Sequence, residues 1–210
     1  GFGVLRRRGV RQQRPQRHRA DVLGVLHREI EIKLPVSDPA GLAESLRARG
    51  YIESRSRHFE RNTIYDTPDR ALRARGELIR LRRAGDENIF TFKGRASVAK
   101  HKEREEIESR LADPVEFELI LARLGYVATF RYEKYRTEWS RPGLPGIVMI
   151  DETPIGVFTE LEGPPEWIDS EAAALGFSEA DYTNLSYARI YEQHCRDNQI
   201  EPSHMVFDPA

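Results

Sequence analysis

Charged and apolar residues alternate along eight short stretches of this chain, and that alternation restricts its fold more than any other feature. The clearest stretch is Glu29-Ile30-Glu31-Ile32-Lys33-Leu34. Successive side chains of a β-strand point to opposite faces, so its two carboxylates and its ammonium share one face and its aliphatic residues share the other. The pattern predicts strands over residues 28–34, 57–66, 77–84, 88–94, 103–110, 129–140, 146–152 and 156–162.

The other strands also place charges on one face. Those charges are Arg80 and Arg82, Lys93, Arg104, Glu106 and Glu108, Lys134 and Arg136, Asp151, and Glu160 and Glu162. An antiparallel sheet with its polar face in water is the simpler explanation. Several strands, however, hold acid-x-acid or base-x-base pairs, which concentrate like charge, whereas ordinary surfaces mix the two signs. We therefore expect helices to cover the apolar face and the charged face to line a tunnel.

Two segments of the chain resemble each other at a spacing of 75 residues. Asp38-Pro39 opens a predicted helix that ends at Gly50, and Asp113-Pro114 opens one that ends at Gly125. Asp before the helix, Pro at its first position and Gly after its end are typical helix boundaries. Each half reads as a strand, a helix and three strands, which predicts a pseudo-symmetric, eight-stranded antiparallel β-barrel of the α+β class, closed without edges. Further helices are expected near residues 165–175 and 184–194.

The composition excludes several other classes of protein. A chain of 210 residues with a net charge of −1 fits one domain with no overall attraction to nucleic acid or membranes. The single cysteine, Cys195, rules out an intramolecular disulfide framework and fits a reducing compartment, so we expect a cytoplasmic protein. No apolar run approaches the roughly 20 residues that span a membrane.

The two ends of the chain differ in character from residues 27–195. Residues 1–26 are rich in arginine without sustained periodicity, which predicts a flexible basic tail. A targeting or nucleic-acid-binding arm is the alternative for this segment. Residues 196–210 have little pattern and are expected to be a mobile C-terminal tail.

The residue types on the charged face suit a polyanion bound together with a divalent metal. Carboxylates are the ligands that Mg²⁺ and Mn²⁺ prefer, and arginine and lysine bind phosphate oxygens. Together they would neutralise the charge that develops in phosphoryl transfer. The chain holds no HExxH zinc motif, no Walker loop and no G-x-S-x-G motif, so a triphosphate-processing enzyme is the leading hypothesis.

The ordered series of motifs along residues 27–195 resembles the CYTH superfamily, the triphosphate tunnel metalloenzymes. The similar motifs are Glu29-x-Glu31-x-Lys33, Tyr65-Asp66-Thr67-Pro68, Arg80-x-Arg82, Phe92-Lys93-Gly94, Arg104-Glu105-Glu106-Ile107-Glu108, Lys134-x-Arg136, Ile150-Asp151 and Glu160-x-Glu162. The resemblance implies an eight-stranded tunnel in which Glu29, Glu31, Asp151, Glu160 and Glu162 bind Mg²⁺ or Mn²⁺. It implies that the triphosphate is bound by Lys33, Arg80, Arg82, Lys93, Lys134 and Arg136. It also assigns catalytic roles to Lys33, Glu106 and Glu108.

Residues 130–137 and 151–156 most resemble the class IV adenylyl cyclase-like subgroup. This resemblance implies conversion of ATP to cyclic AMP and pyrophosphate. A triphosphatase acting on inorganic triphosphate or thiamine triphosphate is the alternative, and a non-catalytic module that binds polyphosphate or nucleotides is a further one. A homodimer is an expectation by analogy alone. Residues 185–191 match the family's closing helix loosely, and the resemblance assigns no role to Tyr187.

Overall fold

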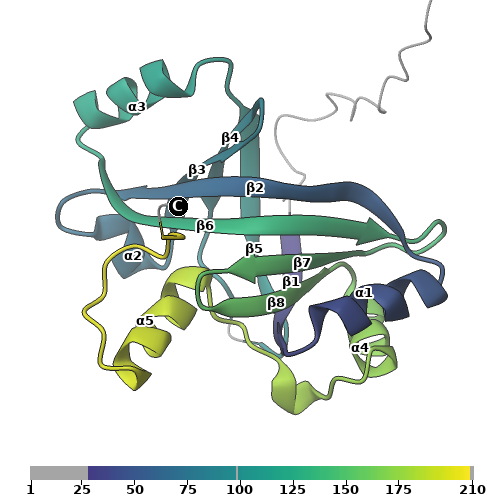
Figure 1. Cartoon of the computed structure of the whole chain (residues 1–210). Helices are drawn as coiled ribbons and strands as arrows, with labels where there is room; N and C mark the ends of the chain where they lie inside the picture. The colour runs from purple at the N-terminus through teal and green to yellow at the C-terminus, as the bar shows by residue number, and fades with distance from the viewer. Residues whose placement is uncertain (1–27, 98, 209–210) are drawn as a thin grey trace, which may run out of the picture.

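The computed structural model describes residues 28–97 and 99–208, and eight strands dominate its architecture. They are β1 (Arg28–Val36), β2 (Ile52–Asp66), β3 (Leu78–Ala84), β4 (Glu87–Lys93), β5 (Lys102–Arg110), β6 (Val127–Ser140), β7 (Ile147–Thr153) and β8 (Gly156–Glu162). All neighbouring strands are antiparallel, and they close into one barrel in the order β1-β5-β4-β3-β2-β6-β7-β8 (Figure 1). The predicted fold class and all eight strands are confirmed, although β2 begins five residues before the expected start at 57.

The helices are α1 (Pro39–Ala48), α2 (Ala71–Arg75), α3 (Pro114–Arg123), α4 (Pro165–Ala174) and α5 (Tyr187–Asp197). The Asp38 carboxylate accepts the backbone N–H of Gly41 at 2.9 Å, and Asp113 caps α3 in the same way. The last helix runs over 187–197 rather than the predicted 184–194, because Ser186 is its N-cap. The sequence did not predict α2, which is too short to show a helical period.

The repeat seen in the sequence is a structural repeat. Helices α1 and α3 have the same length and lie 75 positions apart. Each half of the chain contributes three consecutive strands to the barrel, β2 to β4 or β6 to β8, and sends its first strand to the other half. Thus β1 pairs with β5 and β8, and β5 pairs with β1 and β4. The two halves are therefore interlocked.

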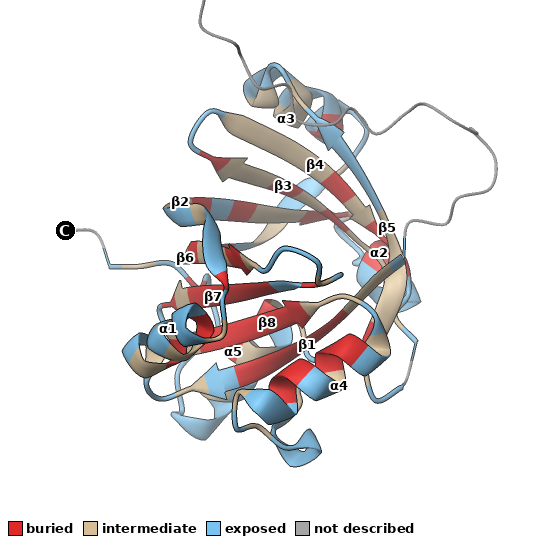
Figure 2. Ribbon diagram, turned by 90° about the vertical axis from the view of Figure 1, so that its right-hand side faces the viewer, coloured by how far each residue is buried: buried red, intermediate tan, exposed pale blue. Residues whose placement is uncertain are grey.

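The outer face of the barrel carries the apolar core. One cluster joins Ile32 and Leu34 of β1 to Leu46 of α1 and Ile168 of α4, and all four side chains are 0% exposed. Figure 2 shows the buried residues running along β1, β7 and β8 under these helices. A second cluster packs α2 and α3 against β3 and β4. The apolar side of the alternating pattern therefore faces helices, as predicted.

Helix α5 closes one end of the barrel. Its residues Tyr187, Tyr191 and Cys195 pack against Tyr132 and Phe158, which point inward from β6 and β8. Among the described residues, no helix has the length and apolar content needed to cross a membrane.

The C-terminal segment, predicted as a mobile tail, packs in part against β6. Met205 is 1% exposed and exchanges backbone hydrogen bonds with Arg131 and Glu133 of that strand. The predicted basic tail at residues 1–26 lies outside the described residues.

Candidate functional site

The interior of the barrel is a charged cavity of about 710 Å³. Among the residues that the structure describes, nine bases line it: Arg28, Lys33, Arg80, Arg82, Lys93, Lys102, Arg104, Lys134 and Arg136. Six carboxylates of the same part of the chain line it as well: Glu29, Glu31, Glu106, Glu108, Glu160 and Glu162. Of the residues that the sequence singled out for binding or catalysis, all except Asp151 lie in this lining. The structure therefore brings together side chains from β1, β3, β4, β5, β6 and β8.

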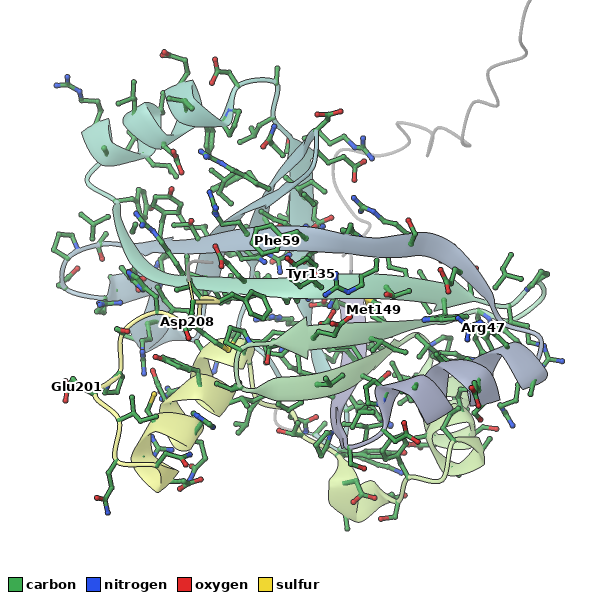
Figure 3. The ribbon with its side chains drawn as sticks, in the orientation of Figure 1. Arg47, Phe59, Tyr135, Met149, Glu201 and Asp208 are labelled. Atoms are coloured by element: carbon green, nitrogen blue, oxygen red, sulfur yellow. The ribbon has the colours of Figure 1, made fainter. Side chains whose placement is uncertain are left out.

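Aromatic contacts on β2 and β6 show which side chains of these strands point outward and which point inward. Phe59 and Tyr135, labelled in Figure 3, pack together with ring centroids 5.2 Å apart, and both contact Phe207 of the C-terminal segment on the outside. Because side chains alternate, their neighbours Glu60 and Lys134 point inward, where both are buried.

Lys33 of β1 lies between two carboxylates. Its Nζ is 2.9 Å from Glu31 Oε2 and 3.3 Å from Glu160 Oε1. Lys102 Nζ donates to the other oxygen of Glu31 at 2.5 Å. Burial alone would raise the pKa of Glu31, but Lys102 and Lys33 outweigh burial and hold that pKa well below its ordinary value. Burial and the nearby bases Lys33 and Arg104 lower the pKa of Lys102 to about 8, against the opposing effect of Glu31.

A second group of charges joins β4 and β5 to the start of β1. Lys93 Nζ donates to both oxygens of Glu29, at 2.8 and 2.6 Å, and lies 2.9 Å from Glu106 Oε2. Arg104 Nε is 3.4 Å from Glu29 Oε2. Glu29 is thus bound by bases from two other strands.

Asp151 lies behind the cavity lining and is 0% exposed. It accepts hydrogen bonds from Lys134 Nζ at 2.8 Å, from Arg136 Nε and Nη2 at 2.7 and 2.6 Å, and from the Tyr187 hydroxyl at 2.6 Å. Burial and the negative charge of Asp151 raise the pKa of Tyr187, which keeps this hydroxyl protonated. The structure therefore places Asp151 as the partner of two bases and of α5, and its expected role as a metal ligand remains a prediction.

One carboxylate of the lining, Glu162, is not paired with a base among the described residues. Within the described residues no three acidic, histidine or cysteine side chains form a ready ligand set, because most carboxylates lie against bases. Glu162 is different: it forms no side-chain hydrogen bond or ion pair in the described part of the chain. Burial and the neighbouring carboxylates Glu29, Glu31 and Glu106 raise its pKa to about 7. A cation bound beside Glu162 would relieve this repulsion, and Mg²⁺ and Mn²⁺ prefer such oxygen ligands.

The sequence analysis did not single out several residues of this site, among them Arg28 at the start of β1, Lys102, Tyr187 and Glu60. Lys102 continues the inward phase of Arg104 and Glu106, so the alternation could have indicated it. Tyr187 reaches the site only because α5 closes the barrel. Glu60 is 1% exposed and lies 3.6 Å from Lys134 Nζ and 3.8 Å from Arg82 Nη1. Burial raises the pKa of Glu60, but Lys134 and Arg136 outweigh burial and hold it well below its ordinary value.

Comparisons with known proteins agree with this geometry. A family model described as the CYTH domain matches residues 27–175. A protein of Methanocaldococcus jannaschii, provisionally named as an adenylate cyclase, is 27% identical over 134 residues, which cover 64% of this chain and 75% of that protein.

Solved structures share the fold. A Vibrio parahaemolyticus protein, also provisionally named as an adenylate cyclase, has a TM-score of 0.70 at 19% identity and covers 78% of this chain and 97% of its own. A Hippeastrum protein with a TM-score of 0.59 at 16% identity covers 80% and 95%, and is described as a provisional adenylyl cyclase with a dominant triphosphatase activity.

Proposed function

Because the chain belongs to the CYTH family, we propose that it is a Mg²⁺- or Mn²⁺-dependent enzyme of the adenylyl cyclase type, which converts ATP into cyclic AMP and pyrophosphate. The observation that carries this proposal is the cavity in the barrel interior, which nine bases and six carboxylates of the described residues line. The excess of bases attracts a polyanion. The carboxylates would hold the metal that a triphosphate brings with it.

The bases of the lining hold and polarise the phosphates in this proposal. Arg80 and Arg82 of β3 and Lys134 and Arg136 of β6 would donate to phosphate oxygens and disperse charge on the departing pyrophosphate. Glu29, Glu31, Glu160 and Glu162 would hold the metal, which when bound neutralises charge at the reacting phosphate. In the reaction the ribose 3′-oxygen attacks the α-phosphorus. The bond from this phosphorus to the bridging oxygen breaks, pyrophosphate leaves and the hydroxyl proton is released.

The size and composition of the cavity favour an organic triphosphate. A volume of about 710 Å³ lies within the range of about 300–1,000 Å³ that is usual for small-molecule sites. Part of the lining is apolar, and it includes Ile64, Leu78, Tyr132 and Tyr187. Such side chains can pack against a nucleoside but offer little to inorganic triphosphate.

A triphosphatase is the second candidate. The Hippeastrum structure, which shares the fold, is described as having a dominant triphosphatase activity. The two reactions use the same bases and carboxylates and differ in the nucleophile, which is water in the hydrolase.

The test is to incubate the full chain with Mg²⁺ or Mn²⁺ and either ATP or inorganic triphosphate, and to identify the products by chromatography. Cyclic AMP with pyrophosphate supports the cyclase. Phosphate release without cyclic AMP assigns the triphosphatase, and binding without turnover assigns the binding module. Glu31→Gln should abolish turnover. Glu152→Gln serves as the matched control, because Glu152 pairs with Arg57 on the outside of the barrel and should leave turnover unchanged.

A further inference from the structure

Asn62 is a buried amide on the inner face of β2 whose polar atoms are not satisfied. It is 0% exposed, and neither its Nδ2 nor its Oδ1 has a hydrogen-bond partner among the described residues. Its neighbour Arg61 points outward and pairs with Glu133. Since side chains alternate along the strand, Asn62 points into the barrel.

This arrangement is unfavourable in a free protein. A buried donor or acceptor that lacks a partner loses its hydration without compensation, whereas an apolar residue of the same shape does not. Unpaired buried polar groups are rare in folded proteins. The amide of Asn62 is therefore unlike the buried charges around it, each of which has an opposite charge nearby.

Asn62 lies behind the lining, next to the point where the charged part of the lining meets its apolar part. Its partners across the sheet are Arg82 of β3 and Tyr132 of β6. On its own strand, Glu60 precedes it on the inner face and Ile64 follows it. Glu60 contacts bases, while Ile64 packs in the cluster beneath α5. The amide thus lies between the groups suited to phosphates and the groups suited to an organic moiety.

The chemistry of an amide also differs from that of the lining. Arginine and lysine only donate hydrogen bonds and carboxylates only accept them, whereas a carboxamide does both. Phosphate oxygens would leave Oδ1 unsatisfied because they carry no donor. A pair of hydroxyl groups satisfies both atoms, since one hydroxyl accepts from Nδ2 and the other donates to Oδ1.

We propose that Asn62 determines specificity by binding hydroxyl groups on the organic part of the triphosphate, an inference that rests on the proposed function. Arg82 and Tyr132, the cross-strand partners of Asn62, both line the cavity, and the proposal requires that one of these side chains shift on binding so that the ligand reaches the amide. Asn62 then separates hydroxyl-bearing triphosphates from inorganic triphosphate.

The test is the variant Asn62→Leu, which keeps the branching and the number of side-chain heavy atoms and removes both polar atoms. Its melting temperature without ligand should be equal to or above that of the wild type, because the unsatisfied groups are gone. By calorimetry, its Kd for a non-hydrolysable ATP analogue should rise about tenfold or more, and its Kd for a non-hydrolysable triphosphate analogue should change about twofold or less. Thr63→Val, on the outer face of the same strand, should change neither affinity.

Four results would overturn the inference. A lower melting temperature with both affinities unchanged would make Asn62 a structural residue. An equal loss of affinity for both analogues would show that the amide binds the phosphate groups that the two analogues share. If the wild type binds the inorganic analogue but not the ATP analogue, the triphosphate site is supported and the hydroxyl-bearing ligand is excluded. If the wild type binds neither analogue, the proposed function fails together with the inference.

Discussion

Each base that points into the barrel from a described residue lies within 4 Å of a carboxylate, but the contacts differ in length. Arg136 and Lys134 bond Asp151 at 2.6–2.8 Å, whereas Arg80 and Arg82 lie 3.5–3.8 Å from the nearest carboxylate oxygens. A phosphate competes with those carboxylates for N–H donors. Arg80 and Arg82 are therefore the bases most available to an incoming triphosphate.

Substitution of Asp151 tests how much its short contacts with Lys134 and Arg136 contribute to stability. Asp151→Asn keeps the shape of the side chain but leaves Lys134 and Arg136 without their full counter-charge, and loss of one partner of a buried ion pair costs about 3–5 kcal/mol. We expect a loss of this size in the free energy of unfolding measured with urea. The neighbouring Glu152→Gln should cost no more than about 1 kcal/mol, since its pair with Arg57 is exposed. Equal losses in the two variants would contradict this account.

Glu162 should make stability depend on pH. Its pKa in the folded protein is about 7, above the ordinary value, so the folded state retains a proton that the unfolded state releases. The resulting stabilisation is fully present below about pH 4.5 and is lost as the pH rises through about 7. Its full size is roughly 3 kcal/mol.

The measurement is the melting temperature in EDTA at pH 5 and pH 8. Glu162→Gln mimics the protonated acid, so we expect it to match the wild type at pH 5 and to melt higher at pH 8. A difference between the two proteins that does not change with pH would refute the prediction.

At the scale of elements, the alternation of residues was enough to predict the strands and most of the site. It could not predict irregularities. β2 and β6 pair with register shifts between Glu53 and Arg55, between Arg55 and His58 and between Ile64 and Tyr65. A shift of one residue moves a side chain to the opposite face. β2 contributed no predicted site residue, although its Glu60 is buried inside the barrel beside Lys134.

The Asp66-Thr67-Pro68 motif has a structural role that the sequence did not reveal. The Asp66 carboxylate accepts the backbone N–H groups of Thr67, Leu72 and Arg73, at 2.8, 2.9 and 3.0 Å. It therefore holds the first turn of α2 against the end of β2.

Removing this cap should destabilise the protein. We expect Asp66→Ala to lower the free energy of unfolding by about 1–2 kcal/mol, measured by urea denaturation. Asp69→Ala, an exposed residue of the same loop, is the control and should change little. If both variants unfold at the same urea concentration, Asp66 does not act as a cap.

For the whole molecule, the segments that close the barrel are those whose positions local sequence patterns predict poorly. Helix α5 is mostly polar, with Tyr187, Ile190, Tyr191 and Cys195 in its apolar cluster, and residues 198–208 show no period. Their positions depend on long-range contacts, such as Tyr187 with Asp151 and Met205 with β6. Local patterns carry no information about such contacts.

The C-terminal segment should contribute to stability. Deleting residues 204–210 exposes the part of β6 that bonds Met205 and removes Phe207 from Phe59 and Tyr135. We expect the melting temperature to fall by several degrees, since burial of a methionine alone contributes about 1.5–3 kcal/mol. Deleting only residues 208–210 is the control. Identical melting curves for both truncations would show that the packed segment contributes nothing.

The barrel holds a dense set of charges inside and packs its main apolar clusters outside, under helices. Substitutions that retune ligand choice and substitutions that repack the scaffold therefore fall on opposite faces of the same strands. Mutations can change the side chains that face the ligand while those that pack against the helices are kept. New activities can therefore arise without loss of the fold. The Vibrio parahaemolyticus protein shares this fold at 19% identity, so most positions of the scaffold accept a different residue.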